Sequence, residues 1–551
     1  MRYLHNAAPA EERVKIQNIE DVADGCYKLL RLLHRPRNQA TWALLTRMAL
    51  ELENRQQQYG ANATLHRVAV VVLDKCVTGF HFIAKHGKPP SRLSTTYTWN
   101  GTLIQDAEHA LLISKRYLDF ANIFPMWHKN HEEAELITDE RVRFHIPNDT
   151  PRQRQVIAYQ QGERPRGTIA DAPYMKRKDT PPHVTRLMND FYQRIRPGGG
   201  AGKFTYKPTS EVIEALRPEY EERLDSNFRH PDSFVLNGYT LKEFKSFYVA
   251  LLILCGIHEY VCYPWNRPGQ PVPVSSLVMV KSRVNWIAEL QQISGLPSRT
   301  CQQITTDLTF DPLSKNASLC INPFVPLDQF TLAVAPQFPL ASAVDENVLR
   351  TFSYLYPALF SAQNTEKDAA MKTALRTANP GYRIEDSIEL PDKSTEIDIL
   401  LEDEDSSTVV LAELKWIRKP NRVLERIDRE ADVAKGLRQL ALIRDYTRKH
   451  PSFLKQRGKL NKPLDEYTHV YYLLLIRDFW YWHPPDNAIA LVDFDSFLPD
   501  FQKSKNLQQL VQTMLTYDWL PVEGQDFTVM YTPSTVHGVT LESPLFKSTR
   551  P

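Results

Sequence analysis

Cysteine is scarce in this sequence, with six among 551 residues. No two of the cysteines form a C-x-x-C pair, and they are too sparse to build a disulfide framework. We therefore expect no disulfides and a reducing, cytoplasmic environment. Cys255, His258 and Cys262 share one face of an expected helix, which could suggest zinc, but free cysteines are more often buried as small apolar residues.

Long apolar runs and an excess of one charge are also absent. The longest apolar run, Phe247–Ile257, is well short of the ~20 residues that cross a bilayer. The first residues lack the apolar stretch of a signal peptide. Basic residues number 67 and acidic residues 65, so the net charge of +2 says nothing about a polyanionic partner. We expect a soluble protein without membrane contact.

A chain of this length should form two to four domains, and its composition changes along the sequence. We expect a helical N-terminal domain (1–140), a basic Pro- and Gly-rich segment (141–209), a helical middle domain with an extended crossover (210–339), an α/β core (340–500) and a C-terminal extension (501–551). The helices are predicted from apolar residues at three- and four-residue spacing, over Asp21–His34, Ala40–Gln58, Leu65–Lys85, Gly101–Phe124, Ser210–Leu216, Thr240–Tyr260, Ser282–Ser294 and Ser298–Asp307. The predicted fold class is multidomain α+β with an α-helical N-terminal half.

The segment from Arg141 to Lys207 is strongly basic, with 14 Arg or Lys against five Asp or Glu. Aromatic residues are interleaved with these cations. Cations that neutralise phosphates and rings that stack on bases are typical of a nucleic-acid groove, whereas the alternative is a solvated linker. The loop RPGGGAGKFT in this segment resembles a phosphate-binding loop, but Phe204 stands where Ser or Thr would hold Mg²⁺, so we expect no nucleotide cofactor.

Two β-type runs, Glu396–Leu401 and Thr408–Ile417, are separated by an acidic turn that can close a hairpin. Alternation in the second run puts Val409, Leu411, Glu413 and Lys415 on one face, and Val410, Ala412, Leu414 and Trp416 on the other. In the first run, Glu396 and Asp398 share a face. Since neighbouring strands lie about 4.8 Å apart, Asp398 is expected to face Glu413 across the hairpin.

This pair of acids is costly to place in a sheet. Two carboxylates about 4 Å apart repel by roughly 4 kcal/mol at an effective dielectric constant of 20. Mg²⁺, which binds carboxylates, waters and substrate phosphates, would remove that cost. Lys415 could then orient or deprotonate an attacking water. The pattern indicates hydrolysis of a phosphodiester. In the absence of a divalent cation, neutralising Asp398 should leave stability unchanged or raise it.

Asp398 followed after 15 residues by Glu413-Leu414-Lys415 resembles the D…E-x-K signature of the restriction-endonuclease-like PD-(D/E)XK nuclease superfamily. The neighbouring elements strengthen the resemblance. A helix pattern at Asn364–Ala378, a strand at Tyr382–Leu390, a long amphipathic helix at Arg422–His450 and strands at His469–Ile476 and Ala488–Phe494 follow the order of that family's core, over about residues 343–498. Ile397 replaces the proline of the motif's name. The resemblance implies a central mixed β-sheet flanked by helices, and the N-terminal half resembles no family.

The resemblance also implies functional roles. Asp398, Glu413 and Lys415 would be catalytic, with Mg²⁺ (Mn²⁺ can substitute) bound by Asp398 and Glu413. Glu366, in the first helix, would be a further metal ligand, or else a surface charge at a helix N-terminus.

A second group of residues would contact nucleic acid. Lys435 and Gln439 would hold the scissile phosphate, or else lie on a charged outer helix face. The cluster with Arg418, Lys419 and Arg422 would meet further phosphates.

The implied activity is a metal-dependent nuclease, for which DNA is favoured over RNA. Members of this superfamily commonly serve restriction, phage defence or repair. The alternative is a non-catalytic nucleic-acid-binding or scaffold protein that retains the fold. In either case the helical N-terminal half could bind a protein partner or form a homo-oligomer.

Overall fold

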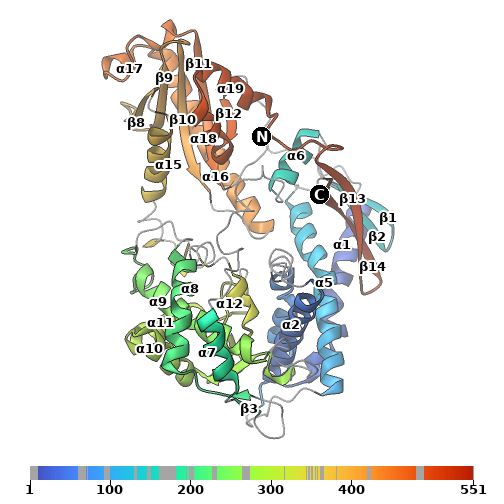
Figure 1. The fold of residues 1–551 in the computed structure, drawn as a ribbon. Coiled ribbons are helices and arrows are strands. Elements are labelled where there is room, and N and C mark those ends of the chain that lie inside the picture. Colours follow the sequence, from blue (N-terminus) through green and yellow to red (C-terminus); the bar gives the residue numbers. More distant parts are fainter. Residues whose placement is uncertain are drawn as a thin grey trace.

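The computed structural model describes residues 10–59, 70, 72–91, 100–129, 133–145, 151–160, 182–193, 195–197, 204–225, 232–262, 274–314, 317–342, 344, 348, 352–353, 355–356, 358–359, 365–379, 381–417, 423–478 and 489–549. Figure 1 shows the order and arrangement of its elements. The protein is α+β, with a mostly helical N-terminal region and its larger sheets assembled later, as the sequence predicted at this coarse level.

The helices of the N-terminal region differ from the prediction in their boundaries. They are α1 (Ala10–Asp24), the 3-10 helices η1 (Gly25–Leu29) and η2 (Arg31–His34), α2 (Arg37–Tyr59), α4 (Thr78–His86) and α5 (Gly101–His128). A continuous helix over Asp21–His34 was a wrong prediction, because Gly25 weakens helical structure and Leu30 is extended. The long α5 begins where the Asn100 side chain accepts a hydrogen bond from the Leu103 N–H.

The middle region is also mainly helical, with a small sheet. It contains α6 (Pro151–Gln160), α7 (Pro182–Gln193), β3 (Arg196–Pro197), β4 (Phe204–Thr205), α8 (Ser210–Asp225), α9 (Leu241–Cys262), η5 (Val274–Ser276), β5 (Met279–Ser282), α10 (Arg283–Ser294), α11 (Ser298–Asp307), β6 (Val325–Pro326), β7 (Thr331–Val334) and α12 (Gln337–Ala341). The crossover predicted as extended supplies β6 and β7, which pair with β5 in the order β5-β7-β6.

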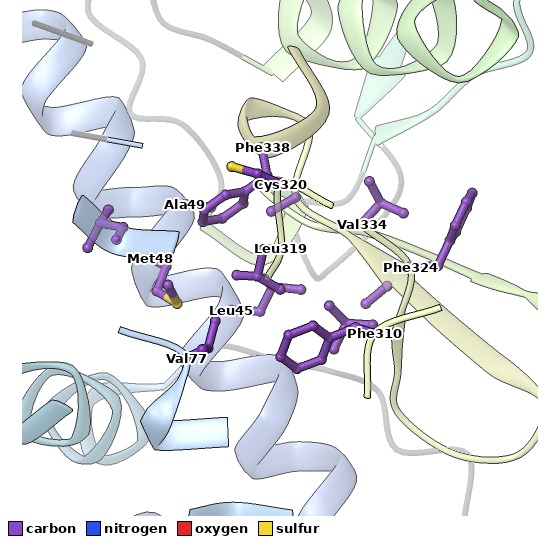
Figure 2. Close-up of a cluster of buried hydrophobic side chains, with 14 of the residues drawn as sticks. Leu45, Met48, Ala49, Val77, Phe310, Leu319, Cys320, Phe324, Val334 and Phe338 are labelled. Carbon is purple, nitrogen blue, oxygen red and sulfur yellow. The ribbon is translucent and has the colours of Figure 1, made fainter. Parts of the chain in front are cut away.

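The N-terminal and middle helices share one hydrophobic core. Leu45, Met48 and Ala49 of α2 and the neighbouring Val77 face residues from the middle region in Figure 2. Their labelled partners are Phe310, Leu319, Cys320, Phe324, Val334 and Phe338, all buried. The six cysteines are free and buried, as expected for packing residues.

Helix α9 is long and apolar enough to cross a membrane by length and composition. Of its most apolar 18-residue window, 72% is buried inside the protein. A buried core helix passes the same test of length and composition, so α9 is only weak evidence for a membrane span. A capping box closes the start of this helix. The Glu243 N–H donates to Thr240 Oγ1 over 3.2 Å, and Glu243 Oε2 accepts from the Thr240 N–H over 2.7 Å.

The C-terminal α/β region has each helix and strand predicted between residues 364 and 494, with small differences at the ends. Its elements are α15 (Thr365–Ala378), β8 (Arg383–Glu389), β9 (Glu396–Asp403), β10 (Thr408–Trp416), α16 (Val423–Lys449), α17 (Phe453–Gln456), η6 (Leu464–Glu466), β11 (His469–Arg477), β12 (Ile489–Asp493), α18 (Phe494–Lys503) and α19 (Leu507–Thr516). Its five strands form one mixed sheet in the order β12-β11-β10-β9-β8. Strands β8, β9 and β10 form an antiparallel meander, and β10, β11 and β12 are parallel.

Helices cover both faces of this sheet. Val433, Leu440 and Ile443 of α16 pack on the face that carries Val409 and Leu411 of β10. Residues of α15, α18 and α19 pack on the opposite face with Val410, Ala412 and Leu414. The predicted alternation of β10 is therefore confirmed for these residues, and burial on both faces explains why its strands are almost continuously apolar.

The C-terminal extension returns to the N-terminal region. It contains two long paired strands, β13 (Phe527–Val536) and β14 (Val539–Ser548). They join the hairpin of β1 (Glu133–Thr138) and β2 (Arg141–His145) in a sheet ordered β1-β2-β14-β13, with β14 parallel to β2 (Figure 1). The boundary predicted at residue 140 lies inside this hairpin.

Arginines of the basic segment hold this C-terminal part in place. Arg141 and Arg143 both pair with Glu542 of β14. Arg152 donates to the carbonyls of Thr516 and Tyr517 over 3.2 Å. In addition, Arg154 pairs with Glu523 over 2.7 Å. These four cations of the segment therefore make intramolecular contacts.

Candidate active site

The predicted acids lie where β9 and β10 stop pairing. The antiparallel ladder runs from Asp403–Thr408 to Ile399–Ala412, one pair short of Asp398 and Glu413. Beyond that point Asp398 Oδ2 accepts a hydrogen bond from the Leu414 N–H over 2.8 Å, so the Asp398 side chain takes the place of the missing backbone contact. The buried Asp398 carboxylate therefore lies against the strand segment that carries Glu413.

The regular alternation of side chains along β8 and β9 is interrupted at the position of Asp398. Ile399 packs in the core under α15, whereas Ile397, two residues earlier, packs in the core under α16. On β8, Ser387 has a φ of 52°, and Ser387 and Asp398 are missing from an otherwise regular ladder. A left-handed non-glycine residue is uncommon, and strained backbone of this kind clusters at functional sites. Regular alternation did not predict this change of face.

Glu413 and Lys415 lie on the same face of β10, under α16. The Glu413 side chain is buried, with 2% exposed, whereas that of Lys415 is 22% exposed. The Lys415 ammonium forms an ion pair with Glu413 Oε1. The glutamate thereby directs the ammonium toward the end of the strand where Asp398 lies.

Gly436 of α16 allows the helix to pass close to Lys415. A Cβ atom at this position would lie 2.8 Å from Leu474 Cδ1 and 3.4 Å from Lys415 Cε. Leu474 is completely buried in β11, so it has little room to move. Sequence analysis missed Gly436, and its only signal was a glycine in the interior of a long helix, where glycine normally has a packing reason.

The two α16 residues predicted to contact phosphate flank Gly436. Lys435 is exposed. Gln439 is half-buried, and its Nε2 donates to Thr395 Oγ1, just before β9, over 3.4 Å. Gln439 Oε1 is buried and has no hydrogen-bond partner. The structure thus brings Gln439 to the strand end that carries Glu396 and Asp398.

Lys372 of α15 is a cation in the site that sequence analysis also missed. Its ammonium lies 3.8 Å from Asp398 Oδ1 and 3.8 Å from Glu396 Oε1. It also donates to Ser387 Oγ over 2.9 Å. The residue is only 9% exposed, so the ammonium is largely withdrawn from water. Lys372 occurs in the predicted first helix, but only the folded chain shows which helix face meets Asp398.

Four predicted residues lie wholly or partly outside the described part of the chain. Glu366 belongs to α15, but the position of its side chain is not described. Arg418, Lys419 and Arg422 lie between the described ends of β10 and α16. Their roles stay predictions.

The donor set is compatible with Mg²⁺. Asp398 and Glu413 supply hard carboxylate oxygens, and Mg²⁺ sites commonly use one or two carboxylates completed by waters and substrate phosphates. Among the described residues no group of three His, Cys, Asp or Glu side chains is close enough to form a metal site. A site here would therefore take its further ligands from water, the Leu414 carbonyl, phosphate or Glu366, whose side chain is not part of that described set. The expected repulsion between the two acids is partly offset, because Lys372 lies beside Asp398 and Lys415 pairs with Glu413.

The weaker zinc candidate in the middle region is a packing cluster. His258 is buried, with Nδ1 2.6 Å from the Tyr206 hydroxyl and Nε2 2.6 Å from the Ser276 carbonyl. Burial lowers the pKa of His258 to about 4, so the ring is neutral at pH 7. Both of its nitrogens already have protein partners, which favours the packing interpretation.

Comparisons with protein-family models, with curated proteins and with solved structures found no match for this chain. Its function is therefore inferred from the residues and their geometry alone.

Proposed function

We propose that this protein is a Mg²⁺-dependent nuclease of the PD-(D/E)XK type, whose α/β core contains the active site and whose preferred substrate is DNA. The observation that carries the proposal is the meeting of Asp398 with the Glu413–Lys415 strand at the point where β9 and β10 separate. The order helix, antiparallel meander, helix, parallel strand around it supports the same assignment. Roles in restriction, phage defence or repair, in the cytoplasm, belong to the proposal by analogy with the superfamily.

Asp398 and Glu413 would hold the metal, together with the Leu414 carbonyl and with Glu366 as a further ligand. When bound, Mg²⁺ polarises the scissile phosphate and lowers the pKa of a coordinated water. The ion pair with Glu413 keeps the Lys415 ammonium at the end of β10, where it can orient the attacking water and stabilise negative charge on the phosphate.

The second helix would bind the substrate. Gln439 and Lys435 lie on either side of the Gly436 contact with Lys415, so both are near the same strand end. The amide of Gln439 and the ammonium of Lys435 can donate hydrogen bonds to phosphate oxygens. Arg418, Lys419 and Arg422 would extend this positive surface along the backbone of the nucleic acid.

Cleavage assays test the proposal. Purified protein is incubated with Mg²⁺ or Mn²⁺ and with supercoiled, linear and single-stranded DNA and RNA. We expect metal-dependent cleavage that Lys415→Ala and Glu413→Ala each abolish, while nucleic-acid binding persists because phosphate contacts are spread over many cations. Lys449→Ala, at the exposed far end of α16, is the matched control and should keep activity. Full activity in either site variant would refute the assignment.

A non-catalytic nucleic-acid-binding protein is the second candidate. It is favoured by the fact that both acids have a cationic neighbour in the protein itself, so the fold does not need a metal ion to offset their charges. This candidate predicts nucleic-acid binding that is unchanged by EDTA and no cleavage with any of the substrates.

A further inference from the structure

The Lys372 ammonium lies beside the Asp398 carboxylate, which is also a ligand of the proposed metal site. Asp398 Oδ2 accepts from the Leu414 N–H, and Oδ1 lies 3.8 Å from the Lys372 ammonium. A metal ion on Oδ1 would bond at about 2.0–2.1 Å. It would then lie at most about 6 Å from the ammonium, which is closer than the ~10 Å over which salt screens charges.

The ammonium has a second set of contacts beside the first. Ser387 Oγ is its nearest partner, at 2.9 Å, and Glu396 Oε1 lies 3.8 Å away. Ser387, which accepts this hydrogen bond, has a left-handed backbone with a φ of 52°. Lys372 can therefore move away from Asp398 while keeping hydrogen-bonded and ionic partners, as a flexible lysine side chain allows.

We propose that Lys372 is a positioning residue that acts as a built-in counter-ion for Asp398 and competes with the divalent metal. Without metal, the ammonium offsets the charge of the buried carboxylate and keeps it in place. Metal binding shifts the ammonium toward Ser387 and Glu396, so the site binds metal more weakly than its carboxylates alone would. This role rests on the proposed metal site, and it makes Lys372 a regulator of the affinity of that site for divalent metal.

Binding of Mn²⁺ alone to the full chain, measured by calorimetry or electron paramagnetic resonance, tests this role without nucleic acid. Lys372→Met keeps the length of the apolar stem and removes the charge. We expect it to bind Mn²⁺ about tenfold more tightly than the wild type, since a nearby like charge is removed. Ser387→Ala should change affinity in the opposite direction, by about threefold, because the ammonium loses its alternative partner.

Arg376→Met is the matched control. Arg376 lies one turn further along α15 and pairs with Asp386 of β8, so this variant removes a cation from the same helix without changing the partners of Asp398. Its Mn²⁺ affinity should equal that of the wild type. If Lys372 were only a structural contact, Lys372→Met would lower thermal stability equally with and without Mn²⁺ and leave the affinity unchanged, which would overturn the inference.

Asp398→Asn separates this inference from the proposed function. If Asp398→Asn loses Mn²⁺ binding while Lys372→Met and Ser387→Ala both match the wild type, the role of Lys372 is refuted and the metal site stands. If Asp398→Asn binds Mn²⁺ as well as the wild type does, the metal site itself is refuted. Should Lys372→Met fail to fold, the weakening expected in Ser387→Ala still decides the outcome.

Discussion

The single residue Asp398 has both unfavourable and favourable electrostatic interactions with its neighbours. Repulsion from Glu413 alone predicts that neutralising Asp398 stabilises the metal-free protein. In the structure the carboxylate instead accepts from the Leu414 N–H and lies beside the Lys372 ammonium. The ion pair with Lys372 is favourable only while the carboxylate is charged, and the charge also strengthens the hydrogen bond, so we expect these local contacts to outweigh the repulsion.

Asp398→Asn should therefore lower the free energy of unfolding in EDTA, by about 1 kcal/mol. An amide can still accept from the Leu414 N–H, but it loses the attraction to Lys372. Mg²⁺ should widen the gap, because only the wild type gains stability from a ligand that binds the folded state. Chemical denaturation in EDTA and in millimolar Mg²⁺ measures both differences. Glu396→Gln, at a half-exposed carboxylate near the same lysine, is the control and should change stability by less than about 0.5 kcal/mol.

Helix α16 is a single element that contacts both the proposed site and the helical region. Its Gly436 packs against Leu474 and Lys415, and the helix also contacts α5 of the helical region. The single helix therefore influences both the position of Lys415, the proposed catalytic lysine, and the contact between the two regions.

Gly436→Ala tests the close approach of α16 to the sheet. Alanine favours a helix by about 1 kcal/mol over glycine, whereas overpacking a core costs about 1–3 kcal/mol. Because Leu474 is buried and only 2.8 Å from the new methyl, we expect overpacking to dominate. Stability should fall by about 1 kcal/mol and cleavage should fall more than stability explains, since Lys415 is displaced. Unchanged cleavage would show that the contact does not position Lys415.

Glu430 of α16 should make stability depend on pH. Burial raises its pKa to about 7, and Arg426, 4.0 Å away, only partly offsets this. The folded state therefore binds a proton more tightly than the unfolded state does, and stability is lost as pH rises from about 4.5 to 7. Glu430→Gln should raise the free energy of unfolding above pH 7 by on the order of 2 kcal/mol, and have little effect near pH 4.5. Denaturation at both pH values checks this, and an equal effect at both would contradict it.

In the whole molecule, the basic segment and the C-terminal part of the chain are in contact although they are far apart in sequence. The basic segment after residue 140 contacts the C-terminal part of the chain, through the pairing of β2 with β14 and through four arginines. Basic charge in this segment is therefore not all available to nucleic acid.

Two sets of variants separate these roles. Arg152→Ala combined with Arg154→Ala should lower stability by about 1–3 kcal/mol and leave the salt dependence of nucleic-acid binding unchanged, because both side chains have internal partners. The second set is Lys176→Ala, Arg177→Ala and Lys178→Ala, at positions outside the described residues. If they contact phosphates, each should reduce the slope of log affinity against log salt by about one unit. Binding measured at several salt concentrations, with melting curves, checks both sets.

The elements of the α/β region were predictable from the sequence alone, and the same local patterns proposed Asp398, Glu413 and Lys415 as a set. Both are local properties, because alternation along β10 and helical spacing along α15 and α16 depend on residues close together in the chain. Only the tertiary structure decided that Lys372 lies beside Asp398, that Ser387 is left-handed opposite it, that Gly436 contacts Lys415, and that β14 pairs with β2. These contacts join separate elements, and their geometry follows from how the elements pack, which no single stretch of sequence contains.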